Sequence, residues 1–196
     1  MPATALDPKT ALVVIDLQKG MSAFPTVHPF PVVVANAARL AAAFRRAKLP
    51  VVLVTVTFSA DGGDCFRSRA DVPPRAIPTT PGFAGVVPEL GPEPGDLLIV
   101  KRQPNAFYGT ELDLQLRRRG VTGIVLTGVS TSSGVDGTAR AAYERAYNLT
   151  FAVDAITDLD AATHEHVVKK VYPKLGEVDT TDAILALLGP LTAAAT

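Results

Sequence analysis

The sequence has no tryptophan, only one cysteine, and no apolar stretch near the ~18 residues that a membrane span requires. The single thiol, Cys65, cannot form a disulfide within the chain. The N-terminus has no basic segment followed by an apolar one, so we expect no secretory signal peptide. These absences predict a cytoplasmic protein that does not enter a membrane.

The sequence also has no excess of positive or negative charge, because 19 Lys and Arg residues balance 19 Asp and Glu residues. A chain without a positive excess is not expected to bind nucleic acid or an anionic membrane as its main partner. Its 196 residues are 47% hydrophobic, enough for one domain with a substantial core. No internal repeat or domain boundary is visible, so residues 1–196 are interpreted as a single domain. The apolar excess favours a homo-oligomer with a buried subunit interface.

Patterns of metal ligands and of phosphate-binding glycines are absent as well. His164 and His166 are two positions apart and face different sides of a predicted helix. His28 is distant in sequence and lies in a proline-rich loop. The segment 127–131 lacks the glycine spacing of a dinucleotide-binding loop. We therefore predict neither a catalytic metal nor a cofactor.

Short apolar runs alternate with helical patterns along most of the chain. The predicted strands are Ala11–Leu17, Pro50–Phe58, Asp96–Lys101, Gly123–Val129, Leu149–Val153 and a short edge strand at Glu177–Thr180. The predicted helices are Val33–Lys48, Thr110–Arg119, Val135–Ala146, Ala161–Val171 and Asp182–Leu188. This alternation predicts an α/β protein with three αβα layers: a Rossmann-like, doubly wound, mostly parallel sheet of about six strands, with helices on both faces.

Residues 59–96 interrupt this alternation with a long segment rich in Gly, Pro and Asp, here called the excursion. One short helix is predicted in it, near Phe83–Leu90. Long irregular segments in compact domains are often functional.

Polar residues stand near the carboxyl ends of three predicted strands, where the sites of open α/β sheets form. The first strand carries Asp16 and Gln18, the third ends in Lys101 and leads to Gln103, and the fourth leads to Gly134. An aspartate within an apolar run is costly unless it is paired or needed. Lys101 could pair with Asp16 if the first and third strands lie close. Such a pair fits a functional site or a structural ion pair equally well.

Three segments in this order and spacing resemble the isochorismatase-like hydrolase family, within the cysteine hydrolase superfamily. They are Ala11–Gln18, Val100–Leu112 and Thr127–Thr131 with Val135–Arg140, and Asp154–Asp158 also fits. In the amidases of this family an aspartate, a lysine and a cysteine form a triad whose thiolate attacks a carbonyl. The resemblance assigns the aspartate to Asp16 and the lysine to Lys101. It also implies that Val129-Ser130 is a cis peptide that helps to build the oxyanion site.

By the same resemblance, Gly134 stands at the position of the cysteine nucleophile. Glycine has no side chain to attack with, so a covalent thiol route is excluded. The true isochorismatases of the family also carry glycine there, and hydrolyse a vinyl ether with the aspartate as general acid and water as the source of oxygen. They carry an Ala-His pair where this chain has Ser132-Ser133, so isochorismate itself is not inferred as the substrate. The glycine is expected to leave room for a substrate or a water.

The resemblance therefore implies a hydrolase that acts on a small molecule, with Asp16 as general acid and base and Lys101 as its electrostatic partner. Vinyl-ether hydrolysis is the reaction type that the glycine favours. The alternative is a catalytically inactive binding or regulatory protein that has kept the family fold.

Five further residues are candidates for substrate binding. Gln18 and Gln103 could orient a substrate or only satisfy buried backbone. Phe24 and Tyr108 are candidate pocket walls, with core or subunit packing as the alternative. Arg67 could bind a carboxylate through two parallel hydrogen bonds, although solvated loop arginines are more common.

Two sets of side chains could in principle replace the missing cysteine nucleophile, but both are interpreted as having no catalytic role. The hydroxyls of residues 130–133 are interpreted as N-capping groups of the following helix. Cys65 lies in the excursion, away from the nucleophile position, and is interpreted as a bystander thiol.

Overall fold

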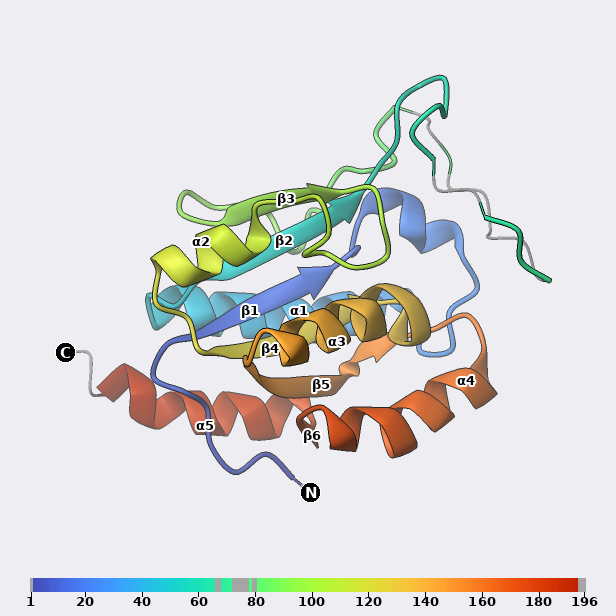
Figure 1. Ribbon diagram of the computed structural model, residues 1–196. Coiled ribbons are helices and arrows are strands. Elements are labelled where there is room, and N and C mark those ends of the chain that lie inside the picture. The colour runs from blue at the N-terminus through green and yellow to red at the C-terminus, as the bar shows by residue number, and fades with distance from the viewer. Residues whose placement is uncertain (1, 66–67, 72–77, 79–80, 194–196) are drawn as a thin grey trace.

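The computed structural model describes residues 2–65, 68–71, 78 and 81–193 (Figure 1). The described residues form one six-stranded sheet in the order β3-β2-β1-β4-β5-β6. Every neighbouring pair of strands is parallel. The strands are β1 (Thr10–Ile15), β2 (Val51–Val56), β3 (Leu97–Lys101), β4 (Gly123–Val129), β5 (Asn148–Thr157) and β6 (Glu177–Asp179).

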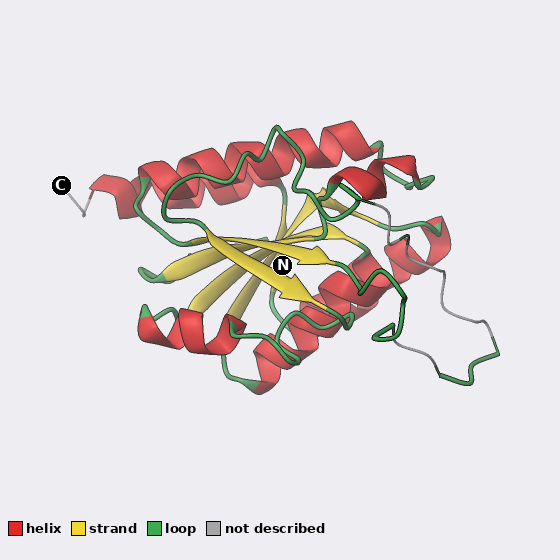
Figure 2. Ribbon diagram, turned by 90° about the horizontal axis from the view of Figure 1, so that it is seen from above, coloured by secondary structure: helices red, strands yellow, loops and turns green. Residues whose placement is uncertain are grey.

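Helices cover both faces of this sheet, which is seen between two helical layers in Figure 2. One layer holds α1 and α5, and the other holds α2 and α3. The helices are α1 (Phe30–Arg46), α2 (Leu112–Arg118), α3 (Asp136–Glu144), α4 (Ala161–His166) and α5 (Thr181–Ala193). Shorter turns are η1 (Lys19–Ala23), η2 (Thr131–Val135), η3 (Val167–Val171) and η4 (Tyr172–Lys174). The predicted three-layer, doubly wound α/β fold is confirmed.

The continuous apolar run of β1 follows from its place between the two layers. Leu12 and Val14 pack into the core beneath α1, whereas Val13 and Ile15 pack into the core beneath α2 and α3. A strand buried on both faces cannot alternate apolar with polar residues. Each such buried side chain contributes about 1.5–3 kcal/mol of hydrophobic free energy.

The predicted helix at residues 83–90 is wrong, because this stretch of the excursion forms successive turns. Gly82 has a φ of 83°, outside the helical range, and Pro88 lacks the backbone N–H that a helix interior needs. Instead the stretch lies along the segment after β1, where Val87 N donates to the carbonyl of Leu17. The excursion is thus joined to the end of β1.

Several predicted boundaries also differ: β1 ends at Ile15 and not at Leu17, and β2 ends at Val56 and not at Phe58. β5 continues to Thr157, beyond the predicted Val153, and its pairing with β4 shifts register between Leu126 and Gly128. The helix predicted at 161–171 begins as α4 and continues as the π-helical turn η3. β5 is thus longer than predicted at the carboxyl edge of the sheet, whereas the segment 161–171 keeps its predicted span.

At the centre of the sheet, β1 and β4 lie side by side, and the strand order runs outward from them in both directions. Ligands of such sheets bind outside the carboxyl ends of the strands at this point of reversal. Asp16 directly follows β1, and η2 directly follows β4 across Ser130. Among the residues described, no helix combines the length and the apolarity needed to cross a membrane.

Candidate active site

A buried ion pair joins Asp16 to Lys101. The lysine Nζ donates to Asp16 Oδ2 at 2.7 Å, and the side chains of Asp16 and Lys101 are 8% and 2% exposed, respectively. β2 lies between β1 and β3, so the backbones of the two residues are about two strand spacings, or ~10 Å, apart. The long lysine side chain crosses the end of β2 to make the contact. Lys101 therefore does pair with Asp16, although one strand lies between the strands that carry them.

The second carboxylate oxygen of Asp16, Oδ1, is buried and has no hydrogen-bond partner among the described residues. Leaving a buried acceptor unpaired costs about 1–3 kcal/mol. Burial raises the pKa of Asp16, and the positive charge of Lys101 opposes this rise. Asp16 also has a φ of 52°, a left-handed conformation that is uncommon outside glycine. An unpaired buried oxygen and an unusual backbone at one residue are features that cluster at functional sites.

The turn that faces Asp16 is built from residues 129–135, here called the elbow. The peptide bond between Val129 and Ser130 is cis, as the resemblance implied, and η2 is a single π-helical turn that leads into α3. Such turns inside helices occur frequently at functional sites. A Cβ built on Gly134 would lie 3.4 Å from Asp16 Oδ2, so this position faces the carboxylate.

The space for a substrate or a water that was expected at Gly134 is not found directly beside its Cα atom. A Cβ there would approach the carbonyl oxygen of Val129 to 2.9 Å and Ile15 Cγ2 to 3.0 Å. Both contacts are shorter than ordinary van der Waals distances, and one is to backbone. A side chain at this position therefore requires the elbow to shift.

The elbow is held by side chains that the sequence analysis gave no role. Thr138 Oγ1 donates to the carbonyl of Gly134 at 2.7 Å and accepts from Ala106 N at 3.1 Å. Asp158 Oδ2 accepts from Ser132 N at 2.7 Å. Thr138 and Asp158 lie within the segments that carried the family resemblance, which was the available signal. Gly134 is four residues from Thr138, but the contacts of Thr138 with Ala106 and of Asp158 with Ser132 join distant parts of the chain and could not be inferred.

The capping interpretation of the elbow hydroxyls is wrong. The side chain of Ser130 makes no capping hydrogen bond, and its backbone carbonyl accepts from Val135 N instead. The hydroxyl of Thr131 pairs with His164 Nδ1 at 2.7 Å. The Thr131 hydroxyl thus fixes the elbow to α4, and the start of α3 is held by the backbone of Ser130 rather than by its side chain.

Two histidines far apart in the sequence meet beside the elbow. The rings of His28 and His164 pack edge to face with centroids 4.7 Å apart, and His28 Nδ1 lies 3.0 Å from the carbonyl oxygen of Ile156. Burial and the neighbouring His28 lower the pKa of His164, and Asp158 opposes this. Within the described ranges, no group of three or more His, Cys, Asp or Glu side chains could hold a metal ion.

Gln18 satisfies buried backbone, the second of its two proposed roles. Its amide oxygen accepts from Val56 N at 2.8 Å, and its amide nitrogen donates to the carbonyls of Val56 and Phe83 at 3.0 and 3.2 Å. The side chain is fully buried. It thereby ends β2 and joins it to the excursion.

The other residues proposed to bind substrate differ in their exposure to solvent. Gln103 is half-buried and Tyr108 is 67% exposed, both in the loop that follows Lys101. Phe24 is half-buried at the end of η1. Arg67 lies outside the described residues. Their binding roles stay predictions, and the exposure of Tyr108 restricts it to the rim of a site.

The excursion is also fixed to the residue after Lys101. Arg102 Nε donates to Asp64 Oδ2 at 2.8 Å. Hydrogen bonds from the backbone and side chain of Ser59 lower the pKa of Asp64 to about 2. Cys65 follows Asp64 directly and is partly exposed. The lone thiol therefore sits on a stretch that is attached beside the end of β3.

Comparison with known proteins agrees with this architecture. The family model described as Isochorismatase domain matches residues 10–183. The uncharacterized isochorismatase family protein YecD of Escherichia coli O157:H7 is 43% identical over 180 residues, which cover 91% of this chain and 96% of that protein. The ureidoacrylate amidohydrolase RutB of Variovorax paradoxus is 30% identical, with 94% of this chain and 83% of that protein covered.

A solved structure is similar over nearly the whole chain. It is that of an isochorismatase family protein from Burkholderia thailandensis, which is 43% identical and superposes with a TM-score of 0.90. The match covers 94% of this chain and 97% of that one.

Proposed function

The chain belongs to the isochorismatase family of hydrolases, and we propose that it hydrolyses a small molecule without forming a covalent intermediate on a cysteine. The free Oδ1 of Asp16 carries this proposal. One oxygen of the carboxyl group is held by Lys101, while the other is buried without a partner among the described residues, beside the elbow. A substrate bound there would meet a carboxyl group able to exchange a proton.

The electrostatics suit Asp16 as a general acid. Burial raises its pKa, which increases the fraction of molecules that hold a proton near neutral pH. Once the proton has left, Lys101 at 2.7 Å stabilises the carboxylate that remains. The pair thus supports both protonation states of one catalytic cycle.

Vinyl-ether hydrolysis is the reaction type that this arrangement fits. The proton of Asp16 adds to the vinyl carbon β to the ether oxygen and leaves an oxocarbenium ion. Water adds to that cation and gives up a proton, which restores Asp16 to its acid form. The resulting hemiketal breaks its carbon–oxygen bond to yield a carbonyl compound and an alcohol. No step requires a thiol.

The elbow serves as a binding surface in this proposal. Gly134 faces Asp16 without a side chain, and the backbone around the cis peptide at Val129-Ser130 lines the same turn. The loop after Lys101 brings Gln103 and the exposed Tyr108 to the rim, and Phe24 is proposed to form a further wall. Amide hydrolysis, the activity in the name of RutB, would need a nucleophile that position 134 does not supply.

The test is a screen of vinyl ethers and small amides, with product analysis in ¹⁸O-labelled water. We expect conversion of a vinyl ether, with label in the carbonyl product, and its abolition in Asp16→Asn. The matched control is Asp182→Asn, at an exposed residue of α5 that forms an ion pair with Arg39 of α1. This variant should convert the substrate at the wild-type rate. Activity that persists in Asp16→Asn contradicts the proposal.

Two further readouts separate the alternatives. A ligand that stabilises the protein but is recovered unchanged favours the non-catalytic binding protein. Alkylation of Cys65, the only thiol, should leave turnover intact. Loss of activity that tracks this labelling would instead favour a thiol route.

A further inference from the structure

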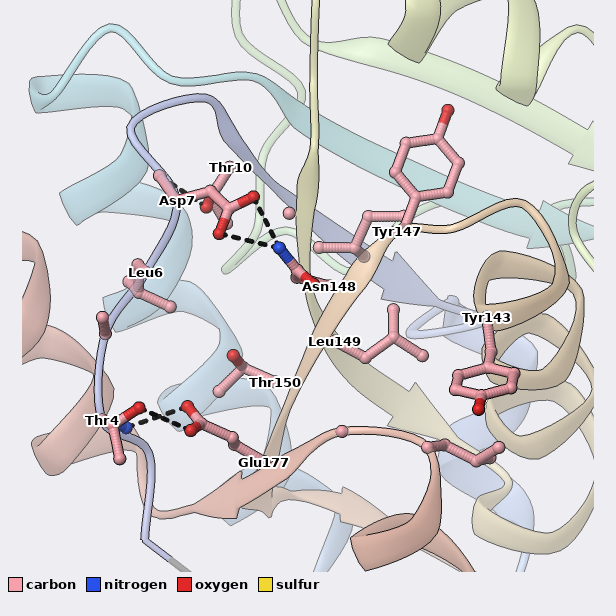
Figure 3. Close-up of a pocket in the computed structure, with 15 residues that line it drawn as sticks. Thr4, Leu6, Asp7, Thr10, Tyr143, Tyr147, Asn148, Leu149, Thr150 and Glu177 are labelled. Carbon is pink, nitrogen blue, oxygen red and sulfur yellow. Dashed lines mark hydrogen bonds between the residues drawn. The ribbon is translucent and has the colours of Figure 1, made fainter.

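A cavity of about 360 Å³ lies at the opposite edge of the sheet from Asp16, at the amino ends of β4 and β5 (Figure 3). Its size falls at the lower end of the range for small-molecule sites. One wall is the N-terminal segment Thr4–Asp7, which passes over the start of β5. None of the residues described so far for the active site lines it.

Two acidic side chains stand at the two ends of this segment. At one end, Glu177 accepts from the backbone N and the hydroxyl of Thr4 at 2.8 and 2.6 Å. At the other end, both carboxylate oxygens of Asp7 accept from Asn148 Nδ2, at 3.1 and 3.0 Å. Figure 3 shows these two contacts with the space between them open. Each carboxylate can accept more hydrogen bonds than it receives here.

Thr150 supplies an independent sign of a ligand. Its side chain is 6% exposed, lines the cavity from β5, and forms no hydrogen bond among the described residues. In Figure 3 its hydroxyl points toward the space between the two acidic residues. The hydroxyl is not among the buried side-chain atoms that lack a partner, so it is reached from the cavity and can pair with a small polar ligand there.

The charge of the lining defines that partner. Among the described residues that line the cavity, Asp7 and Glu177 are the only charged ones, and none is Lys, Arg or His. Thr4 and Asp7 are three residues apart, which in an extended chain separates the two ends by about 10 Å. Leu6 lies between them and offers an apolar surface.

We propose that this cavity binds a short aliphatic diamine. One ammonium group lies against Glu177 and the Thr150 hydroxyl, the other lies against Asp7, and the methylene chain covers Leu6. The site is separate from the proposed hydrolytic centre and does not depend on it.

Isothermal titration of the full chain with putrescine, butylamine and succinate tests this directly. Putrescine should bind saturably with one site per chain, butylamine about tenfold more weakly because it lacks the second charge, and succinate not at all. Glu177→Gln and Thr150→Val should each weaken putrescine binding. The control Glu165→Gln, an exposed residue of α4 paired with Lys169, should bind as the wild type does.

Equal binding of putrescine and succinate, or wild-type affinity in both cavity variants, overturns the proposal. Asp16→Asn should bind putrescine normally, and loss of binding there would place the diamine at the hydrolytic centre instead. Should Glu177→Gln fail to fold, Thr150→Val decides the question, because it replaces an unpaired hydroxyl with a methyl group of similar size.

Discussion

The hydroxyl of Thr138 donates a hydrogen bond to the carbonyl oxygen of Gly134, and the same oxygen atom of Thr138 accepts one from the backbone of Ala106. One side chain on α3 thus connects the elbow with the loop that follows Lys101. The two halves of the candidate site are positioned by a residue that contacts both.

Thr138→Val should therefore lower activity without touching the ion pair. It leaves the Ala106 N–H and the Gly134 carbonyl without their Thr138 partner, a cost of about 1–3 kcal/mol in the free energy of unfolding. Urea unfolding and steady-state kinetics measure the two effects. Thr138→Ser keeps the hydroxyl and should recover most of both; an equally impaired serine variant would contradict the bridging role.

Lys101→Met should destabilise the protein in a manner that depends on pH. The variant leaves Asp16 buried without its cation, which costs about 3–5 kcal/mol while the carboxyl group is ionised. Burial already raises the pKa of Asp16, and removal of Lys101 takes away the charge that opposes this rise. The folded state then binds a proton more readily than the unfolded state, so stability falls as pH rises through the folded pKa.

Urea unfolding of Lys101→Met at several pH values measures this effect. The deficit relative to wild type should shrink as pH is lowered toward the ordinary pKa of an aspartate. Lys169→Met removes an exposed ion pair on α4 and η3 and should cost at most about 1 kcal/mol at every pH. A deficit for Lys101→Met that does not vary with pH would argue against coupling to Asp16.

Gly134→Ala should destabilise the elbow by about 1–3 kcal/mol, because its Cβ would lie 2.9 Å from the Val129 carbonyl oxygen. Gly137→Ala, three positions further on in α3, is the matched control. Its Cβ would meet nothing closer than 3.6 Å, and alanine is favoured over glycine inside helices by up to about 1 kcal/mol. Thermal melts should therefore move in opposite directions for the two variants; a neutral Gly134→Ala would mean that the elbow adjusts freely.

Stability should also decline in mild acid because of His164. Burial and His28 lower its pKa, so the folded state binds a proton less readily than the unfolded state. This contribution to stability is present above the unfolded pKa of about 6.5 and is lost progressively as pH falls below it. His164→Gln should flatten the unfolding free energy between about pH 7 and pH 5, whereas His166→Gln, at an exposed position, should leave the slope unchanged. Identical slopes in wild type and His164→Gln would assign the effect elsewhere.

The sequence predicted the residues of the ion pair because their signal is local. An aspartate within the apolar run before Gln18, and a lysine at the end of another such run, are visible without a structure. The βαβ alternation then places both at the carboxyl edge of a parallel sheet. The position of Gly134 was likewise visible from its place after the fourth strand.

The supporting contacts could not be predicted because they join segments that only the folded chain brings together. His28 precedes α1 and His164 lies in α4, and nothing in the spacing of either histidine indicates the other. Gln18 could equally have faced a substrate until its three backbone partners were known. The wrong helix at residues 83–90 differs from these cases, because Pro88 was a local signal against it, whereas the contact of Val87 with Leu17 was not visible in the sequence.

The amide of Gln18 couples the excursion to the site. By pairing with both backbone groups of Val56, it fixes the last residue of β2, over which the side chain of Lys101 passes. The same amide donates to the carbonyl of Phe83 in the excursion, and Arg102 binds Asp64 in another part of it. A change in these parts of the excursion therefore reaches the residues on either side of the acid–base pair, so substitutions far along the chain from Asp16 and Lys101 should alter the reaction they support.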